Sequence, residues 1–438
     1  MKILIVSYYF APQNLIGAVR PTKLAKYLAR MGHEVTVICG AGRDGRIDPT
    51  LERDMQEFRD VHLITEWNPL RTLAVKRQAA VQEAPKAAPA AAVSAPAKKS
   101  GLKKLIFKAV DTAYVYLRWR ADVSFSRLGR KELKKLKGPY DAVFSTYAPF
   151  SVHEIACKAK RMGLAKHWIA DFRDEVGMAF AYQEGKKQRY MQMLRREADV
   201  LSAVSDGFLE MMDFQDVGRV LSNGFDREDI PEVQQEALSG KLRVVYCGQL
   251  MDSRREVGDR DITPMFRALA KQIEAGLLKK EELELVYAGR EGALFSRYAA
   301  ASGLEKCVID HGQVSRARSI ALQKSADILL MASHHMASQR GILTGKLFEY
   351  MMMDKPIVCC VAGDLPGSGI KKVLCETGMG LCCESVLGQE DEEKLQQWTA
   401  ELLHLWREGR SLLAGKNVQM VETYEYSHLA RTLAEWML

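Results

Sequence analysis

The amino-acid sequence predicts an α/β protein made of two doubly wound parallel-sheet domains. Two observations carry this prediction: short apolar runs alternate with stretches of helical periodicity, and the alternation starts a second time in the middle of the chain. The length of 438 residues agrees with it, because one domain usually takes about 100–200 residues. The composition, 47% hydrophobic and 27% charged, is typical of a globular chain.

The first series of elements opens with an apolar strand at 2–6. A loop to Gly17, an amphipathic helix from about Pro21 to Met31 and a second strand at 35–39 follow. The same alternation returns at Asp141–Ser145, His167–Ala170 and Val200–Val204. Because ligands of parallel sheets gather beyond the carboxyl ends of the strands, we expect loop 10–20 at a ligand site.

The second series begins after a polar connection near Arg227–Gly240. Its apolar runs are Leu242–Cys247, Leu283–Ala288, Val308–His311, Ile328–Met331 and Pro356–Cys360. We therefore expect a first domain over 1–228 and a second over 240–417.

Neither a membrane span nor a secretory leader is predicted. No stretch approaches the roughly 20 apolar residues of a spanning helix, and the N-terminus runs directly into polar and turn residues. The nine cysteines are an odd number, mostly in or beside apolar runs, so we expect reduced, structural thiols. The sequence thus favours a cytoplasmic protein.

An Ala/Pro/Lys-rich segment at 72–100 is too poor in large apolar groups to order itself, and we expect a mobile insertion there. Beyond it, apolar residues share one helical face and basic residues the other. The apolar set is Leu102, Leu105, Ile106, Ala109, Ala113, Tyr116 and Leu117; the basic set is Lys103, Lys104, Lys108 and Arg118. Two interpretations stay open: a membrane-surface anchor over 98–120 and a core-packed helix with a solvated basic side.

The segment GILTGKLFEYMMMDKPIVCC carries features of a phosphate site. It predicts a loop ending at Thr344 and Gly345, a helix from about Lys346 and a buried strand. The backbone N–H groups of Thr344 and Gly345 and the Lys346 ammonium would face phosphates, and Glu349 would accept hydrogen bonds from ribose hydroxyls. An exposed ion pair between Lys346 and Glu349 is the alternative.

The chain resembles the family 4 glycosyltransferases of the GT-B fold, in which two Rossmann-like domains face a cleft. The resemblance covers nearly the whole chain except 72–100. Its motifs are MKILIVSYYFAP, RMGHEVTVI, DAVFSTYAPFSVHEIA, WIADFRDE, SAVSDGF, LSNGFD, YCGQL to RDITPMFRAL, LVYAGR and KLFEYMMMDKPIV. It implies that the first domain receives the acceptor and the second binds the nucleotide sugar. It also implies cleft closure, no metal, and a C-terminal helix over 418–438 that returns to the first domain.

Donor-binding residues follow from the resemblance position by position. Gly17 matches the glycine that approaches the donor phosphates, and Glu349 matches the second glutamate of the family's Glu, seven residues, Glu motif. The first glutamate is replaced by Gly341. Gln249 stands where the family has an arginine that contacts the diphosphate. We therefore expect Arg254, Arg255 or Arg260 to supply the positive charge. Arg260 is preferred because RDITP resembles a signature of the polysaccharide branch.

Three charged residues after a first-domain strand, Asp171, Arg173 and Asp174, are candidate catalytic residues that would orient or deprotonate an acceptor hydroxyl. The alternative is a local Asp–Arg pair that fixes the loop. His153 is expected to cap or pack.

These features together predict a glycosyltransferase of the hexosyltransferase type. It would move a sugar from a nucleotide diphosphate sugar to a glycan or lipid-linked acceptor, in the cytoplasm or at the inner face of a membrane. The resemblance further implies retention and a place in surface polysaccharide or lipopolysaccharide assembly. We expect no cofactor, no metal and no nucleic-acid partner; Asp259 and Asp261 alone do not make a metal site. A nucleotide-sugar epimerase and a non-catalytic nucleotide-sugar or glycan-binding protein are the alternatives.

Overall fold

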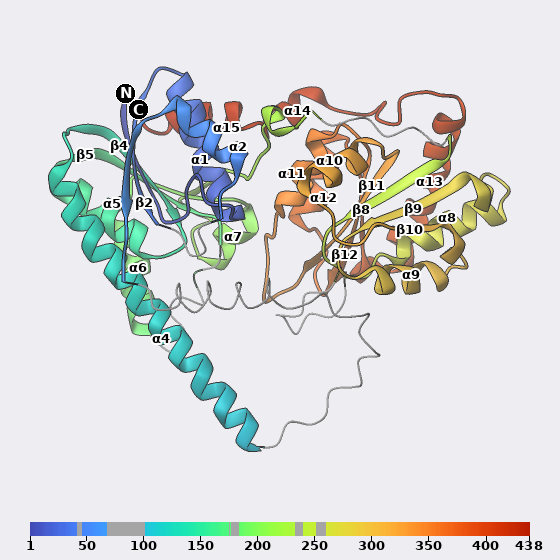
Figure 1. The fold of residues 1–438 in the computed structure, drawn as a ribbon, viewed down its shortest axis with the longest axis horizontal. Helices are drawn as coiled ribbons and strands as arrows, with labels where there is room; N and C mark the ends of the chain where they lie inside the picture. The colour runs from blue at the N-terminus through green and yellow to red at the C-terminus, as the bar shows by residue number, and fades with distance from the viewer. Residues whose placement is uncertain (42–45, 68–100, 175, 177–183, 233–239, 251–259) are drawn as a thin grey trace. The chain divides into compact units, whose positions relative to one another are not determined.

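A computed structural model describes residues 1–41, 46–67, 101–174, 176, 184–232, 240–250 and 260–438, with the backbone alone for 101–111. The chain forms two compact units (Figure 1). The first unit comprises Met1–Ala203, Phe214–Arg219 and Ala430–Leu438, and the second comprises Val204–Asp213 and Val220–Leu429. The expected insertion at 72–100 lies outside the described residues.

The first unit is built on a seven-stranded sheet with the order β3-β2-β1-β4-β5-β6-β7. The strands are β1 (Lys2–Ser7), β2 (Glu34–Gly40), β3 (Asp60–Ile64), β4 (Tyr140–Tyr147), β5 (Ala165–Phe172), β6 (Val200–Ala203) and β7 (Gly218–Val220). The recorded pairings among β1 to β6 are parallel. The four apolar residues from Ile3 to Val6 have no exposed surface, as expected for a strand covered on both faces.

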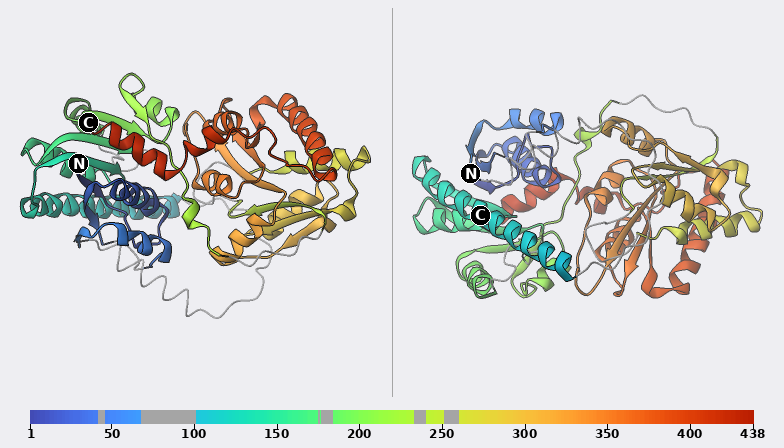
Figure 2. Two further views of the ribbon diagram at one scale, coloured as in Figure 1. Left: turned by 90° about the horizontal axis from the view of Figure 1, so that it is seen from above. Right: turned by 60° about the horizontal axis from the view of Figure 1, so that its bottom comes forward.

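Helices flank this sheet on two sides, with α1 packed on β1 and β2 and α5 on β4 and β5 (Figures 1 and 2). The helices are α1 (Ile16–Arg30), α2 (Pro49–Asp54), α4 (Gly101–Glu132), α5 (Ser151–Arg161), α6 (Glu184–Glu197) and the end of α15 (Tyr426–Glu435). The expected start of α1 at Pro21 is wrong: the helix begins at Ile16 and contains Pro21. Proline lacks an N–H group, so the Gly17 carbonyl loses its usual helical partner.

The second unit repeats this design on a six-stranded sheet with the order β10-β9-β8-β11-β12-β13. Its strands are β8 (Leu242–Cys247), β9 (Leu283–Ala288), β10 (Val308–Asp310), β11 (Ile328–His335), β12 (Ile357–Gly363) and β13 (Gly380–Glu384), and all recorded pairings are parallel. The strand order reverses between β8 and β11. The predicted α/β fold with two doubly wound parallel sheets is confirmed.

Side chains of β8 alternate between two hydrophobic cores, one on each face of the second sheet. Val244 and Tyr246 enter the first core, and Val245 and Cys247 enter the second. The helices are α7 (Asp206–Met211), α8 (Thr263–Glu274), α9 (Gly292–Ala300), α10 (Arg316–Lys324), α11 (Gly345–Met352), α12 (Gly369–Thr377), α13 (Gln389–Arg407), α14 (Val418–Glu422) and the start of α15. All nine cysteines are unpaired thiols and only Cys375 is exposed, which confirms the structural interpretation.

Among the described helices, none combines the length and the apolar character needed to cross a lipid bilayer.

Candidate functional site

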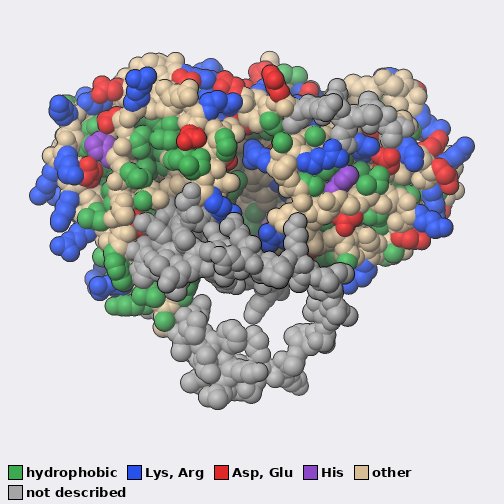
Figure 3. Space-filling view, in the orientation of Figure 1, with side chains coloured by type: hydrophobic (Ala, Val, Ile, Leu, Met, Phe, Trp, Pro, Cys, Tyr) green, Lys and Arg blue, Asp and Glu red, His purple; other side chains and the backbone are tan. Residues whose placement is uncertain are grey.

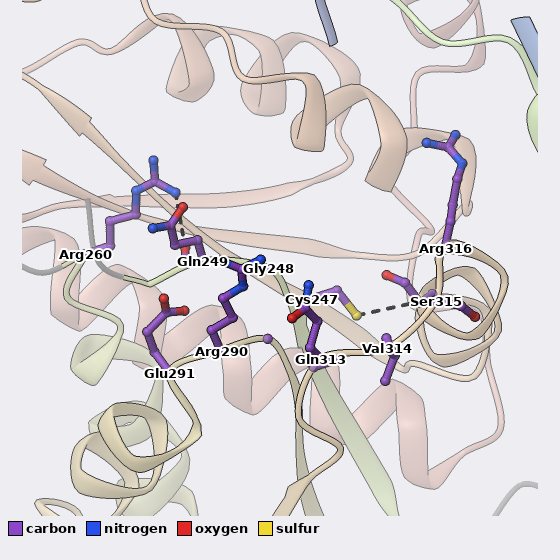
Figure 4. Close-up of a pocket in the computed structure, with 13 residues that line it drawn as sticks. Cys247, Gly248, Gln249, Arg260, Arg290, Glu291, Gln313, Val314, Ser315 and Arg316 are labelled. Atoms are coloured by element: carbon purple, nitrogen blue, oxygen red, sulfur yellow. Dashed lines mark hydrogen bonds between the residues drawn. The ribbon is translucent and has the colours of Figure 1, made fainter. Parts of the chain in front are cut away.

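The carboxyl ends of β8 and β9 open onto a pocket of about 660 Å³ in the second unit (Figure 4). The pocket is lined by three loops and the start of α10: Cys247, Gly248, Gln249 and Arg260; Ala288, Gly289, Arg290 and Glu291; and Gln313, Val314, Ser315, Arg316 and Ser319. It lies beside the point where the strand order reverses, which is where doubly wound sheets bind ligands. Both α9 and α10 begin at its lining, so their first backbone N–H groups add positive polarity.

Three arginines and one glutamate set the charge of this pocket. Arg260 donates a hydrogen bond from Nη1 to the Gln249 carbonyl at 3.2 Å, and its buried Nε has no hydrogen-bond partner within the described residues. Arg290 and Arg316 are exposed. Glu291 is held by the hydroxyl of Tyr287 at 3.0 Å. This excess of cations favours an anionic ligand.

Lys346 lies on α11, next to the loop that follows β8. Its ammonium lies 4.6 Å from the centre of the Tyr246 ring and packs against Gly248. Gly248 has φ of 126°, and a Cβ atom there would collide with the Lys346 amine. Burial, together with the charge of Arg260, lowers the pKa of Lys346 to about 8.

The other residues predicted on α11 have distinct environments. Thr344 is the residue before the helix, and its buried Oγ1 has no partner within the described residues, while Gly345 is exposed. Glu349 is half-buried and accepts a 2.7 Å hydrogen bond from the Gln323 amide. Neither Lys346 nor Glu349 is exposed, and no salt bridge joins them among the described residues, so the alternative of an exposed ion pair is not supported.

Gly341 occupies the position where the resembled family has its first glutamate, and its geometry explains the replacement. Its φ is 73°, and a Cβ atom would lie 2.6 Å from the Phe208 backbone nitrogen and collide with the Ser205 hydroxyl. That hydroxyl donates a 2.6 Å hydrogen bond to the Gly341 carbonyl. A side chain therefore has no room at this position. Arg254 and Arg255, the other cationic candidates, lie outside the described residues.

Gly17 and Arg173 are brought together in the first unit. A Cβ atom on Gly17 would lie 2.7 Å from Nη2 of Arg173, so the close approach expected at this glycine is made by a side chain of the same unit. The guanidinium also lies 5.3 Å from the centre of the Tyr9 ring. Asp174 is 62% exposed and lies 3.9 Å from Arg173.

Asp171 has a different environment from its two neighbours, and its predicted role at an acceptor hydroxyl needs correction. Its carboxylate is fully buried and accepts hydrogen bonds from Nη1 and Nη2 of the Arg20 guanidinium. It also accepts hydrogen bonds from Thr146 at 2.7 Å and Ser202 at 2.9 Å. A carboxylate enclosed in this way holds β4, β5, β6 and α1 together instead of contacting an acceptor.

His153 packs in the core of the first unit, as the sequence predicted. It is fully buried, its Nδ1 lies 2.7 Å from the Ser145 hydroxyl, and burial lowers its pKa to about 3. The ring stays neutral at physiological pH.

The sequence interpretation missed the pocket residues that follow β9 and β10, among them Arg290, Glu291 and Arg316. A signal was present, because the motif LVYAGR spans the end of one strand of the second series and the stretch HGQVSRAR follows the next strand. Only the strand order shows that these loops share an edge with the loop after β8.

Comparison with known proteins finds a family match within the second unit. Residues 230–404 match the family described as Glycosyl transferases group 1. No curated protein matches the sequence.

Solved structures share the fold along the whole chain. The N-terminal domain of trehalose-6-phosphate phosphatase from Candida albicans has a TM-score of 0.62 at 14% identity, over 100% of this chain and 96% of that one. Sucrose-phosphate synthase from Thermosynechococcus elongatus has a TM-score of 0.54 at 11% identity, over 99% and 97%. UDP-GlcNAc 2-epimerase from Neisseria meningitidis bound to UDP-GlcNAc has a TM-score of 0.50 at 10% identity, over 100% and 99%.

The shared fold and the family match over most of the second unit support a glycosyltransferase with two Rossmann-like domains, the GT-B class. Within that class, the matched region contains the pocket and α11.

Proposed function

We propose that the protein transfers a hexose from a nucleotide diphosphate sugar to a glycan or lipid-linked acceptor, with retention, in surface polysaccharide or lipopolysaccharide assembly. The donor binds in the second unit. The diphosphate lies near Lys346, Arg260 and the start of α11, and Glu349 receives the ribose hydroxyls.

The observation that carries this proposal is the packing of the Lys346 ammonium against Gly248, beside an arginine-rich pocket at the strand-order reversal. The negative charge on the two phosphates of the leaving group must be stabilised when the glycosidic bond breaks, and cations and helix N-termini can do this. The second unit has cations and helix N-termini at this place. Charge stabilisation by Lys346 and Arg260 serves the leaving diphosphate, which itself accepts the acceptor proton. No metal and no cofactor enter this mechanism.

In the first unit, we assign Arg173 and Asp174 to the acceptor side, with Gly17 leaving space for the Arg173 guanidinium. Asp171 positions the strand ends that carry them. The protein acts in the cytoplasm or at the inner face of the membrane.

A thermal-shift series tests the donor site. Purified protein is heated with UDP-, GDP-, CMP- and dTDP-linked sugars, and one donor should raise the Tm of wild type but not of Lys346→Ala. A ligand at about 100 times its Kd contributes about 2.7 kcal/mol, which is well within detection. Lys306→Ala, an exposed lysine of the same unit, is the matched control and should keep the shift. No shift with any donor would refute the donor site.

A second candidate, a nucleotide-sugar epimerase, is favoured by the fold shared with the UDP-GlcNAc 2-epimerase. Product analysis separates the two functions. Incubation with the stabilising donor alone should leave the sugar unchanged if the protein is a transferase, whereas an epimerase converts it without any acceptor. NMR of the anomeric proton in the transfer product tests retention.

A further inference from the structure

Helix α4 is 32 residues long, and the buried residues among those with described side chains, 112–132, lie in its C-terminal half. Ala121, Phe125 and Gly129 are buried there, and Gly129 approaches the Ile155 side chain of α5 so closely that a Cβ atom would collide. The N-terminal part extends beyond the other described elements of this unit (Figures 1 and 2).

Aromatic side chains are exposed where the helix leaves the unit. Tyr116 is 54% exposed and Tyr114 is 43% exposed. Trp67, 55% exposed, lies beside the helix because its backbone N–H donates a hydrogen bond to the Ser124 hydroxyl at 3.3 Å. Ala113, one member of the predicted apolar stripe, is exposed as well, so this end of the stripe is not core-packed.

Basic side chains lie on the same side of α4 as Tyr116, closer to the C-terminus of the helix. At about 3.6 residues per turn, Tyr116, Arg120, Arg127 and Lys131 lie along one side, and all four are exposed. Residues 112–137 contain eight lysines and arginines against two acids, a net charge of +6 within a chain whose total is +8. Lys and Arg side chains also gather along the left margin of Figure 3, over the first unit.

One of the two acids of this stretch pairs with one of its lysines: Glu132 accepts a hydrogen bond from Lys135 at 2.7 Å, and it also lies 3.0 Å from His62. The other acid, Asp122, is buried, so both acids lie away from the exposed side that carries Arg120, Arg127 and Lys131. On the neighbouring helix α6, the Lys186 ammonium lies 4.2 Å from the centre of the Trp119 ring, which adds a further cation beside α4.

We propose that this side of α4, formed by Trp67, Tyr116, Arg120, Arg127 and Lys131, docks on an anionic lipid bilayer. Tryptophan and tyrosine occupy the headgroup region of membranes, and arginines behind them bind lipid phosphates. A single projecting helix side offers no groove or platform on which bases could stack, so a bilayer fits better than nucleic acid. The docking side is independent of the donor pocket. It extends past the predicted stretch 98–120, of which residues 98–100 lie outside the described residues.

Vesicle co-sedimentation of the full-length protein tests the docking side. Vesicles of phosphatidylcholine with phosphatidylglycerol should sediment the protein, and phosphatidylcholine alone should not. The double variant Arg120→Glu with Arg127→Glu should lower the partition coefficient about tenfold or more, and added salt should weaken wild-type binding. Trp67→Ser with Tyr116→Ser should weaken binding to the same vesicles at high salt, where the aromatic contribution remains.

A charge-matched control uses exposed lysines of the second unit, Lys279→Glu with Lys306→Glu, which should bind as wild type does. If this control loses binding equally, net charge and not α4 is responsible, and the proposal fails. It also fails if no vesicle binds, or if a labelled RNA or DNA duplex binds at the same salt and vesicles do not. The donor-induced Tm shift of each variant reports folding separately, so a failure of vesicle binding is distinct from a failure of the proposed glycosyl transfer.

Discussion

The ammonium of Lys346 occupies the space that a side chain at position 248 would need. Gly248→Ala should therefore displace Lys346, and it also places a Cβ on a backbone with φ of 126°. We expect a loss of donor affinity of about tenfold or more and a lower Tm. Titration calorimetry with the stabilising nucleotide sugar measures the affinity. Gly415→Ala, where an added Cβ meets nothing within 4 Å, should change neither quantity.

The pKa of Lys346 gives donor binding a pH dependence. Since burial lowers this pKa to about 8, the amine is a cation below pH 8 and becomes neutral above it. Donor affinity should be highest below pH 8 and fall as the pH rises through that value, because the neutral amine no longer attracts the diphosphate. Binding is measured from pH 7 to 9 with an intact nucleotide sugar.

Lys346→Arg is the control for this titration, because a guanidinium keeps its charge throughout that range. If the donor affinity of Lys346→Arg fell with rising pH as steeply as that of wild type, another group would be responsible for the pH dependence. The stability of the free protein changes with pH in the opposite direction to the donor affinity. A lysine whose folded pKa is depressed below 10.5 makes the free protein more stable as the pH rises from 8 to 10.5, since the unfolded state then binds more protons.

Gly17→Ala should separate turnover from donor binding. The three atoms nearest to the added methyl group belong to the end of the Arg173 side chain, which can move, and alanine favours the helix by about 1 kcal/mol over glycine. We expect unchanged or higher stability, unchanged donor affinity in the second unit, and a large loss of kcat. Steady-state kinetics measures kcat, and calorimetry measures donor affinity. Full activity of Gly17→Ala would show that the position of the Arg173 side chain does not affect turnover.

Restoring the family's glutamate should harm the protein. Gly341→Glu places a side chain on a backbone with φ of 73° against the Phe208 nitrogen and the Ser205 hydroxyl. The positive φ alone costs about 1–2 kcal/mol, and the collision adds to it. Urea unfolding should show a lower midpoint with an unchanged slope. Equal stability together with faster transfer would mean that the loop rearranges to accept the glutamate.

Asp171 and Asp174 offer a matched pair of acid substitutions. Asp171→Ala removes the carboxylate that pairs with the buried Arg20 guanidinium and should cost about 3–5 kcal/mol. Asp174→Ala, at an exposed position, should change the free energy of unfolding by less than about 0.5 kcal/mol. Denaturant titration compares the two variants. If Asp171→Ala were as stable as wild type and lost only turnover, the acceptor role would return to Asp171.

Much of the fold was predictable because buried parallel strands are continuous apolar runs, such as Ile3 to Val6. Less apolar strands were not predicted. Asp60–Ile64 is half-exposed at the sheet edge, and Gly380–Glu384 carries a glycine and a buried glutamate. The start of α1 was misplaced because Pro21 signals a first turn, although here it lies inside the helix.

Part of the candidate site was predictable as well, since Lys346 and Glu349 lie on one short helix that follows its loop directly. The pocket itself was not, because its lining joins loops that are far apart in the sequence, from Gly248 to Arg316. Gly341 shows most clearly what cannot be predicted from the sequence alone. The sequence reveals a missing glutamate, and only the backbone angle reveals that no side chain fits there.

The chain passes between its units more than once, and this sets rules for recombining it. Residues 204–213 belong with the second unit, and the last residues, 430–438, belong with the first. A chimaera that exchanged only 240–417 with a relative would leave residues 204–213 to meet a foreign second unit, whereas residues 430–438 would keep their own first unit. Grafting a new donor preference onto this protein therefore needs coordinated replacement of 204–213, while residues 430–438 stay with the recipient.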